Sequence, residues 1–435
     1  MSEKRRGRYP RWLAFLASVG AVSLCGVVLT LFFAFGRRPS ALAVTDMPAV
    51  RSEEFLVSLA GIAGAPLRTG GTVELLDNGD AFFPALLRDL RGAQVTINVL
   101  VFIWDEGQAS DDVMAVLKER ARAGVQVRIL LDGYGGRGAP DKDMDALRDL
   151  GGKVSHFRTP RFGKLTRFHK RTHRRAIVID GRIAYTGGMA IADKWLGNAD
   201  SEEHWRDSMV RVTGPPAASI QSAFAAPWAH SAGEILVGET FYPTLDDSTG
   251  SGAIRTVGVM SAPTSDHHPL RLLFMQTFLA ARRTLYITTP YFVPDRVLRE
   301  AVAAKARSGV DVRILLPDEH TDAFPIRQTT HSYLGELLEA GVRAYEYQPT
   351  MMHAKHVVVD GVWSVVGSPN MDIRSKELNE ENVLCVLDPE LGARLDETFR
   401  RDLARSEEIT LDKWRRRGWP KRVMERGFRL FAEQY

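Results

Sequence analysis

Apolar and polar positions alternate along the chain in two long blocks that predict the same order of elements twice. Val95–Ile103 and Thr284–Phe292 are apolar runs typical of buried strands, and a helical pattern follows each. A second apolar strand then follows, within Ala-Arg-Ala-Gly-Val-Gln-Val-Arg-Ile-Leu-Leu-Asp at 121–132 and Ala-Arg-Ser-Gly-Val-Asp-Val-Arg-Ile-Leu-Leu-Pro-Asp at 306–318. Alternating strands and helices predict α/β layers. The large offset between the copies indicates duplication of a whole domain.

A second repeated pattern ends each block. Its copies run His173-Arg-Arg-Ala-Ile-Val-Ile-Asp180-Gly and His353-Ala-Lys-His-Val-Val-Val-Asp360-Gly, and another apolar run follows each. Strand, Asp-Gly and strand predict a hairpin. Because side chains alternate across a strand, Arg175 and Lys355 share a face with their histidines, whereas the aspartates point away. We therefore interpret Asp180 and Asp360 as turn or packing residues.

The paired histidines indicate chemistry on a phosphate. Histidine changes protonation near neutral pH, so two imidazoles can divide the roles of nucleophile and acid. Two similar halves packed about a pseudo-twofold axis would bring His173 and His353 together, and residues 235–265 are the expected crossover.

An uncharged apolar stretch, Trp12–Phe35, exceeds the roughly 20 residues that span a bilayer. It predicts a single-pass anchor in the cell membrane, although Ala41-Leu42-Ala43 resembles a cleavage site and leaves a signal peptide open. Five cations precede the stretch and two follow it closely, which favours a cytoplasmic N-terminus and an extracytoplasmic catalytic region.

Charge is concentrated at the N-terminus. The chain carries a net +4, but residues 1–40 hold seven Lys/Arg and one Glu, which leaves −2 for the rest. A folded region of that charge does not fit a general nucleic-acid binder, so no nucleic acid is expected. The two cysteines have no metal-type spacing and no zinc signature occurs, so no metal is expected.

The sequence predicts five segments, each with its own character. They are a basic cytoplasmic segment (1–11), the transmembrane anchor (12–35), a linker (36–68), a first domain (69–245) and a second domain (246–435) that ends in a basic, aromatic helix. Nothing in the sequence defines the oligomeric state.

Further motifs, in order, make the chain resemble the phospholipase D superfamily, whose mark is HxKxxxxD twice per active site. These motifs are Trp205-Arg206-Asp207, Thr289-Pro-Tyr-Phe-Val-Pro-Asp295, Gly367-Ser368-Pro-Asn370-Met-Asp-Ile-Arg374-Ser375 and Asn379-Glu380-Glu381-Asn382. The resemblance is greatest to bacterial cardiolipin synthases and runs from about Gly70 to the C-terminus. It implies two duplicated phospholipase D-like α/β/α domains with the active site at their pseudo-twofold interface.

The resemblance also implies roles for the histidines and their acids. One histidine attacks phosphorus and forms a phosphohistidine, while the other protonates the departing oxygen and then activates the acceptor. Family analogy favours His173 as the nucleophile, but the more complete motif surrounds His353, so both assignments stay open. By motif position Asp207 orients His173 and Glu381 orients His353. A surface ion pair is the alternative for Asp207, and Glu380 could replace Glu381.

The phosphate ligands implied by the resemblance are Lys355, Arg175, Ser368 and Asn370, with neither metal nor cofactor. The first half departs from the family twice, since Arg175 stands where Lys is usual and Ala190 where many members carry Asn. Arginine keeps the charge but is larger and forks its donors. A donor missing at Ala190 would weaken stabilisation of the transition state.

The implied function is a phosphatidyltransferase that converts two phosphatidylglycerol molecules into cardiolipin and glycerol at a membrane. The alternatives are a phospholipase D that releases phosphatidic acid, a nucleic-acid phosphodiesterase, and a non-catalytic lipid-binding relative with a drifted first motif. Two basic stretches, 158–175 and 413–431, are candidates for lipid contact. The second stretch reads equally as an interfacial helix or as a helix packed on its own domain.

Overall fold

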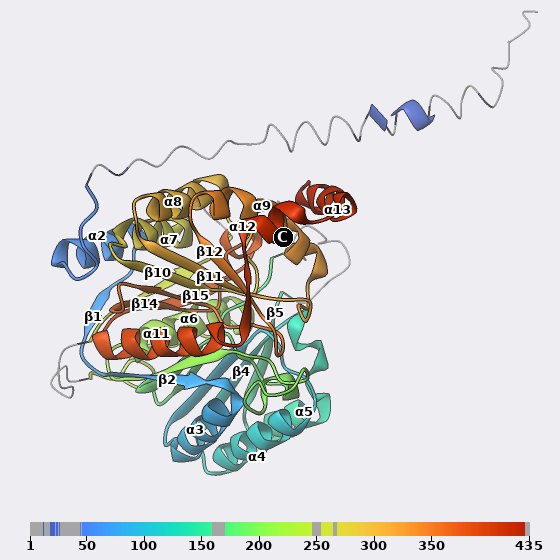
Figure 1. Ribbon diagram of the computed structural model, residues 1–435. Helices are drawn as coiled ribbons and strands as arrows, with labels where there is room; N and C mark the ends of the chain where they lie inside the picture. The colour runs from blue at the N-terminus through green and yellow to red at the C-terminus, as the bar shows by residue number, and fades with distance from the viewer. Residues whose placement is uncertain are drawn as a thin grey trace, which may run out of the picture. The chain divides into compact units, whose positions relative to one another are not determined.

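The computed structural model describes residues 46–158, 170–245, 254–263 and 268–430, together with scattered positions between 12 and 44. The chain divides into two compact units, Met1–Thr45 and Asp46–Tyr435, and the second unit contains both repeated blocks (Figure 1).

The first half builds one mixed sheet. Its strands are β2 (Thr72–Asp77), β3 (Thr96–Val101), β4 (Gln126–Asp132), β5 (Lys153–Phe157), β6 (Ala176–Ile179), β7 (Ile183–Gly187) and β8 (Ser208–Thr213). They lie in the order β2-β8-β7-β6-β3-β4-β5. The helical elements of this half are α3 (Asn78–Gly92), α4 (Gln108–Arg122), η1 (Gly135–Gly138), α5 (Asp141–Asp149), η3 (Asp193–Trp195) and α6 (Ala217–Ala232).

The second half repeats this sheet and extends it at both edges. Its strands are β1 (Leu67–Thr69), β9 (Arg255–Ser261), β10 (Thr284–Thr288), β11 (Asp311–Pro317), β12 (Arg343–Tyr347), β13 (His356–Val359), β14 (Trp363–Gly367), β15 (Glu381–Leu387) and β16 (Ser406–Ile409). The helices are α7 (Pro269–Ala280), α8 (Arg296–Arg307), α9 (Phe324–Glu339), α10 (Ile373–Glu377), α11 (Pro389–Leu403), α12 (Leu411–Arg416) and α13 (Trp419–Arg429).

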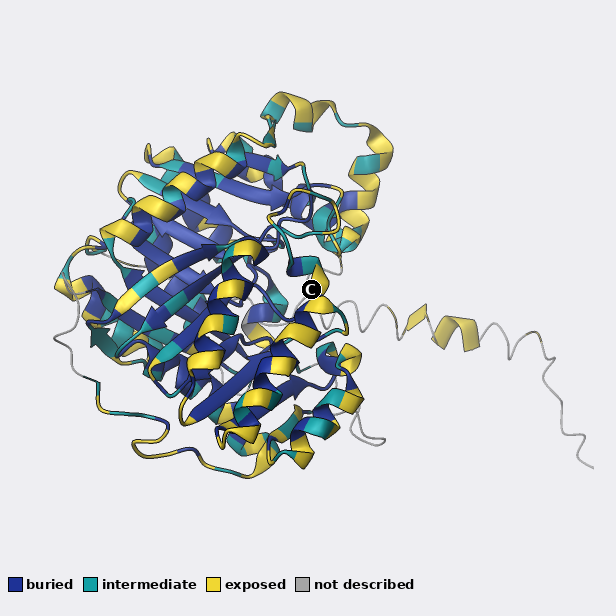
Figure 2. Ribbon diagram, turned by 90° about the horizontal axis from the view of Figure 1, so that it is seen from below, coloured by how far each residue is buried: buried dark blue, intermediate teal, exposed yellow. Residues whose placement is uncertain are grey.

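The two sheets share one topology, which confirms the predicted duplication. The second has the order β1-β9-β15-β14-β13-β10-β11-β12-β16, so its central strands follow the order of the first sheet. In both, the first strand of the α/β block is parallel to the next and antiparallel to the first strand of the hairpin. Figure 2 shows the strands buried in the interior, with most exposed residues on the outer helices.

A shared hydrophobic core joins the halves. Helix α6 and helix α11 contribute Phe224 and Leu395 to it, and both sheets contribute side chains such as Val178 and Val386. A separate core on the outer face of the first sheet packs α3, α4 and α5. Because the inner core belongs to both halves, the relative position of the two hairpins is set by packing.

The two predicted hairpins are confirmed, and so is the structural role of their aspartates. Asp180 and Asp360 adopt left-handed backbone angles, with φ of 52° and 53°. Their carboxylates accept hydrogen bonds of 2.7–3.3 Å from three successive backbone N–H groups, those of residues 94–96 and 282–284 respectively. Each aspartate thus ties the hairpin turn to the start of the neighbouring strand.

Part of the segment expected to be a linker is helical, which corrects that expectation. Helix α2 (Glu53–Ala63) begins after Ser52, whose hydroxyl accepts a hydrogen bond from the Phe55 N–H at 3.2 Å. The helix buries Phe55, whose ring packs edge-on against Trp363 at a centroid distance of 5.1 Å. Only three of its eleven residues are buried, so its apolar positions show weak helical periodicity and the sequence pattern does not predict the helix.

No helix in the described part of the chain is long and apolar enough to cross a bilayer. The predicted anchor, residues 12–35, lies mostly outside the described residues.

Candidate active site

Each repeated histidine is positioned by the backbone of the opposite half. The His173 N–H donates to the carbonyl of Glu380 at 2.8 Å, and the His353 N–H donates to the carbonyl of Arg206 at 2.7 Å. Glu380 is the residue before β15, and Arg206 lies two residues before β8. The segment that carries each histidine therefore docks beside the segment that leads into a strand of the other domain.

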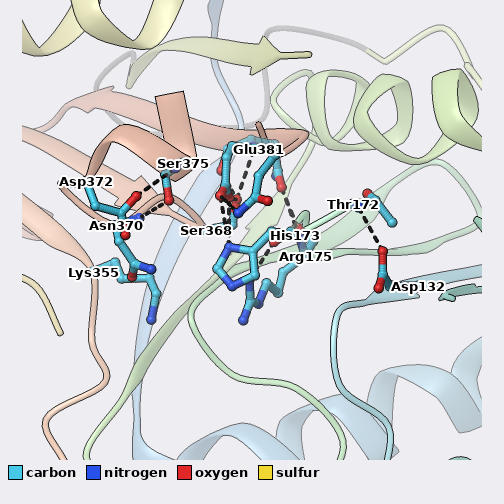
Figure 3. A network of polar contacts seen from close by, with 12 residues as sticks. Asp132, Thr172, His173, Arg175, Lys355, Ser368, Asn370, Asp372, Ser375 and Glu381 are labelled. Atoms are coloured by element: carbon cyan, nitrogen blue, oxygen red, sulfur yellow. Dashed lines mark hydrogen bonds and ion pairs between the residues drawn. The ribbon is translucent and has the colours of Figure 1, made fainter. Parts of the chain in front are cut away.

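The carboxylate partners are exchanged between the halves. His173 Nδ1 lies 3.0 Å from both carboxylate oxygens of Glu381, and His353 Nδ1 lies 2.6 Å from Asp207 Oδ2 (Figure 3 shows the first pair). The prediction that Asp207 orients His173 and Glu381 orients His353 was therefore wrong. Each acid is the residue directly after the one whose backbone carbonyl binds the histidine of the opposite half. The order of the motifs within one half does not indicate this exchange.

The two carboxylates are held by different donors. Glu381 accepts from the Ser368 hydroxyl at 2.5 Å and from Asn379 Nδ2 at 3.3 Å. Asp207 accepts from the indole Nε1 of Trp195 at 2.9 Å. Ser368, expected to bind phosphate, instead donates to the acid of the first histidine.

Burial keeps both imidazoles neutral. Desolvation, reinforced by the charge of Arg175, lowers the pKa of His173 from 6.5 to about 3. Desolvation, reinforced by Lys355, lowers the pKa of His353 to about 4. Burial alone would raise the pKa of Asp207, but the contact with His353 outweighs it and the pKa is lowered. A neutral imidazole that donates Nδ1–H to a carboxylate presents its Nε2 lone pair to the site.

Two buried cations flank the imidazoles. Arg175 is fully buried and donates from Nη1 to the carbonyl of His173 at 2.5 Å, while burial lowers its pKa to about 10. Its Nε and Nη2 have no hydrogen-bond partner among the described residues, and the same holds for Asn370 Oδ1. The Lys355 ammonium lies 3.1 Å from each ring nitrogen of His353, and burial lowers its pKa to about 7.

The site as described is balanced in charge when Lys355 is protonated. Arg175 and Lys355 offset Asp207 and Glu381, and both imidazoles are neutral. A bound phosphodiester adds one negative charge, which a proton on one imidazole can balance. Buried guanidinium nitrogens without partners are costly, so a phosphate oxygen that accepts from them would be strongly stabilised.

The sequence did not predict several residues of the site. One sequence feature, Gly188 in the first half where the second half has Ser368, points to a difference between the halves. The ring of Phe102 packs edge-on to His173 at 4.9 Å, and Trp205 lies 5.1 Å from His353. The first half carries Gly188 where the second carries Ser368, so Asp207 must take its donor elsewhere, and Trp195 supplies it. A Cβ on Gly188 would lie 2.1 Å from Asp207 Oδ1, which explains the glycine.

Ala190, which replaces the asparagine that is common in the family, is a core residue in this protein. It stands at the position of Asn370 and is fully buried in the hydrophobic core of the first domain. It offers no polar group to the site. Among the described residues no three His, Cys, Asp or Glu side chains are grouped as metal ligands would be.

Fold and site together define a duplicated α/β protein with two histidine–carboxylate pairs. In each pair the histidine comes from one half and the carboxylate from the other. The family described as "Cardiolipin synthase, PLD-like domain" matches residues 86–228 and 274–403, one match in each half. The chain belongs to this family.

Individual relatives agree with that assignment. The chain is 33% identical over 357 residues to a protein named cardiolipin synthase from Listeria monocytogenes, covering 81% of this chain and 73% of the relative. It is 30% identical over 378 residues to cardiolipin synthase 1 of Bacillus cereus, covering 85% and 74%. The fold is similar to that of phosphatidylserine synthase from Haemophilus influenzae, with a TM-score of 0.67, 16% identity, and coverage of 88% of this chain and 99% of that one.

Proposed function

We propose that this protein is a phosphatidyltransferase of the cardiolipin synthase type, which converts two phosphatidylglycerol molecules into cardiolipin and glycerol. The observation that carries the proposal is the pair of buried imidazoles, each bonded to a carboxylate of the opposite half and flanked by a buried cation. Relatives with 30–33% sequence identity to this chain bear the name of this activity.

In the first step His173 Nε2 attacks the phosphorus of the donor lipid. A P–N bond forms and the bond from phosphorus to the headgroup glycerol oxygen breaks. His353, protonated on Nε2 once the anionic substrate is bound, gives its proton to that oxygen. Free glycerol leaves, and the phosphatidyl group stays on His173 as a phosphohistidine.

In the second step the headgroup hydroxyl of another phosphatidylglycerol attacks the same phosphorus. The neutral His353 takes the proton of that hydroxyl as the P–O bond forms and the P–N bond to His173 breaks. Glu381 and Asp207 hold the two rings in the useful tautomer and stabilise any positive charge that develops.

The non-bridging phosphate oxygens bind to Arg175 and Lys355 in this proposal. The two unpartnered nitrogens of Arg175 support it, since they offer donors that no described side chain uses. Asn370 adds its side-chain amide. Ser368 acts one step away, through Glu381.

His173 is proposed as the nucleophile because family analogy favours it. His353 then takes the role of proton donor and acceptor.

Water as the acceptor gives the alternative function, a phospholipase D that releases phosphatidic acid. Incubation of the full-length protein in phosphatidylglycerol vesicles, followed by lipid mass spectrometry, tests the choice. Cardiolipin and glycerol in equal amounts support transfer. Phosphatidic acid without cardiolipin would replace transfer by hydrolysis, and no turnover would favour the non-catalytic alternative.

The membrane placement belongs to the same proposal. A lipid substrate and the apolar segment 12–35 support a single-pass anchor with a cytoplasmic N-terminus, followed by domains at 69–245 and 246–435. The charge bias across that segment supports a catalytic region outside the cytoplasm. Labelling of introduced cysteines with a membrane-impermeant reagent in whole cells would test this topology.

A further inference from the structure

A second concentration of cations lies outside the catalytic site, where α12 and α13 cover α9. A pocket of about 500 Å³ opens there. Among the described residues, its charged lining consists of one carboxylate, Glu425, and five arginines, Arg415, Arg417, Arg422, Arg426 and Arg429. No catalytic imidazole lines it.

Among the described residues, acids pair with two of these arginines. Arg415 pairs with Glu339 on α9 at 2.9 Å, and Arg417 pairs with the buried Glu425 at 2.8 Å. Both pairs fix α12 and α13 to the domain and to each other. They add no net charge to the pocket.

No acid in the described part of the chain offsets the other three arginines. Arg422 donates to the backbone carbonyls of Arg417 and Arg415, and the Arg429 guanidinium lies 4.7 Å from the centroid of the Tyr333 ring. Among the described residues, none of Arg422, Arg426 and Arg429 has a carboxylate within ion-pair distance. Three like charges around one pocket repel each other, and a bound anion would relieve that repulsion.

The wall of the pocket is a packed structure. Trp414 donates from its indole Nε1 to the carbonyl of His331 at 3.0 Å, and its ring fills the space left by Gly335, where a Cβ would meet it at 2.3 Å. The Arg417 guanidinium stacks 3.5 Å from the centroid of the Trp414 ring. The pocket is therefore held in shape before any ligand arrives.

The helix that carries three of the pocket's arginines, α13, also exposes apolar side chains to solvent. Trp419 is 76% exposed, Val423 60% and Leu430 82%, all on or next to α13. A short helix with cations on one side and exposed apolar side chains on another is typical of an element that lies at a membrane surface. A free inorganic anion has no apolar part to contact these exposed side chains, whereas a phospholipid has both a phosphate and acyl chains.

We propose that this pocket holds the headgroup phosphate of an anionic membrane phospholipid while Trp419, Val423 and Leu430 enter the boundary between headgroups and acyl chains. The bound lipid is retained and is not the lipid that reacts. Phe428 of α13 packs edge-on against Phe324, the first residue of α9, at 6.0 Å. Docking thus fixes the second domain on the membrane independently of any N-terminal anchor.

Amide hydrogen exchange of the full-length protein in nanodiscs tests the proposal. An inactive His173→Ala background prevents lipid consumption, so the readout does not depend on the reaction catalysed. Discs of mixed phosphatidylglycerol and phosphatidylcholine are expected to slow exchange in α12 and α13 relative to discs of phosphatidylcholine alone. Each cation near an anionic leaflet strengthens binding about fivefold, so Arg422→Gln with Arg426→Gln should weaken it about 25-fold and abolish the protection.

The matched control removes two exposed arginines elsewhere, Arg88→Gln with Arg296→Gln, whose side chains are 63% and 79% exposed. This control should keep the protection. Equal exchange in the two kinds of disc, or equal loss in the control, would overturn the proposal. Protection of the detergent-solubilised protein by inorganic phosphate alone would also overturn it, in favour of a free-anion site.

Discussion

The two halves of the protein share a backbone plan but hold the carboxylates and cations of the site differently. In the second half, Glu381 is held by a serine hydroxyl and an asparagine amide, and the cation is Lys355. In the first half, Asp207 is held by a tryptophan N–H, and the cation is Arg175. The central strands of the two sheets have the same order, so these differences lie in side chains carried on a shared plan.

This difference teaches that a duplicated site need not do the same work twice. The exchange of acids means that each imidazole is surrounded by parts of both halves. His173 receives the well-bonded Glu381, while His353 receives Asp207 and lies against Lys355. Unequal surroundings give the two histidines different tendencies to hold a proton, which suits a nucleophile and an acid.

The largest expected effect comes from removing either histidine. His173→Ala and His353→Ala should each lower kcat by at least about 10⁴-fold, because the two act as one unit. Incubation of the His353→Ala variant with a radiolabelled lipid analogue whose leaving group needs no proton should still label His173. Label on His353 in the His173→Ala variant would reverse the assignment of roles.

The exchanged acids give the next largest effect. Glu381→Gln and Asp207→Asn should each lower kcat about 10²–10⁴-fold, since each leaves a histidine without its carboxylate. A substrate analogue whose leaving group needs no proton should restore much of the rate to Asp207→Asn, which supports the acid. It should leave Glu381→Gln slow. Rescue of Glu381→Gln instead would contradict the assignment of His173 as nucleophile and His353 as acid.

A smaller difference is expected between Gly188 and Ser368. Gly188→Ser places a Cβ against Asp207 and should lower the free energy of unfolding by roughly 1–3 kcal/mol, with loss of activity. Ser368→Gly removes one hydrogen bond to Glu381 and should cost about tenfold in kcat. Thermal unfolding and steady-state kinetics on both variants measure the asymmetry. Equal effects would mean that the two halves tolerate the exchange alike.

The smallest effect concerns pH. The pKa of Lys355 is lowered to about 7, so the free site loses this charge as pH rises through 7. A bound phosphate favours the ammonium form and raises that pKa, so affinity for inorganic phosphate should fall up to about tenfold per pH unit above 7. Lys355→Arg, which copies the first half, should move this decline to higher pH. Calorimetric titration across pH measures it, and a flat profile in the native protein would contradict the mechanism.

Much of the fold could be read from the chain because its signals were local. The repeated strands and the Asp-Gly turns predicted both hairpins, and alternation across a strand predicted that Asp180 and Asp360 face away from the histidines. Helix α2 was missed because a short helix with few buried residues has little periodicity. The site was harder, since the partners of His173 and His353 lie 208 and 146 residues away.

The exchange of acids also follows from the packing of the two sheets, which depends on side chains spread over both halves. The contact between Ser368 and Glu381 could have been suspected from the Gly188 replacement. The role of Trp195 could not, since no spacing ties an indole to a carboxylate 12 residues away.

The crossing of the histidine–acid pairs has a consequence for how such a chain can change over time. Neither half contains both members of a histidine–carboxylate pair, so loss, transplantation or mutation of one half breaks the pairs of both. A substitution at Glu381 is felt first at His173, in the other half, and one at Asp207 at His353. Selection therefore acts on the halves jointly, and compensating changes should be sought across the interface and not within a repeat.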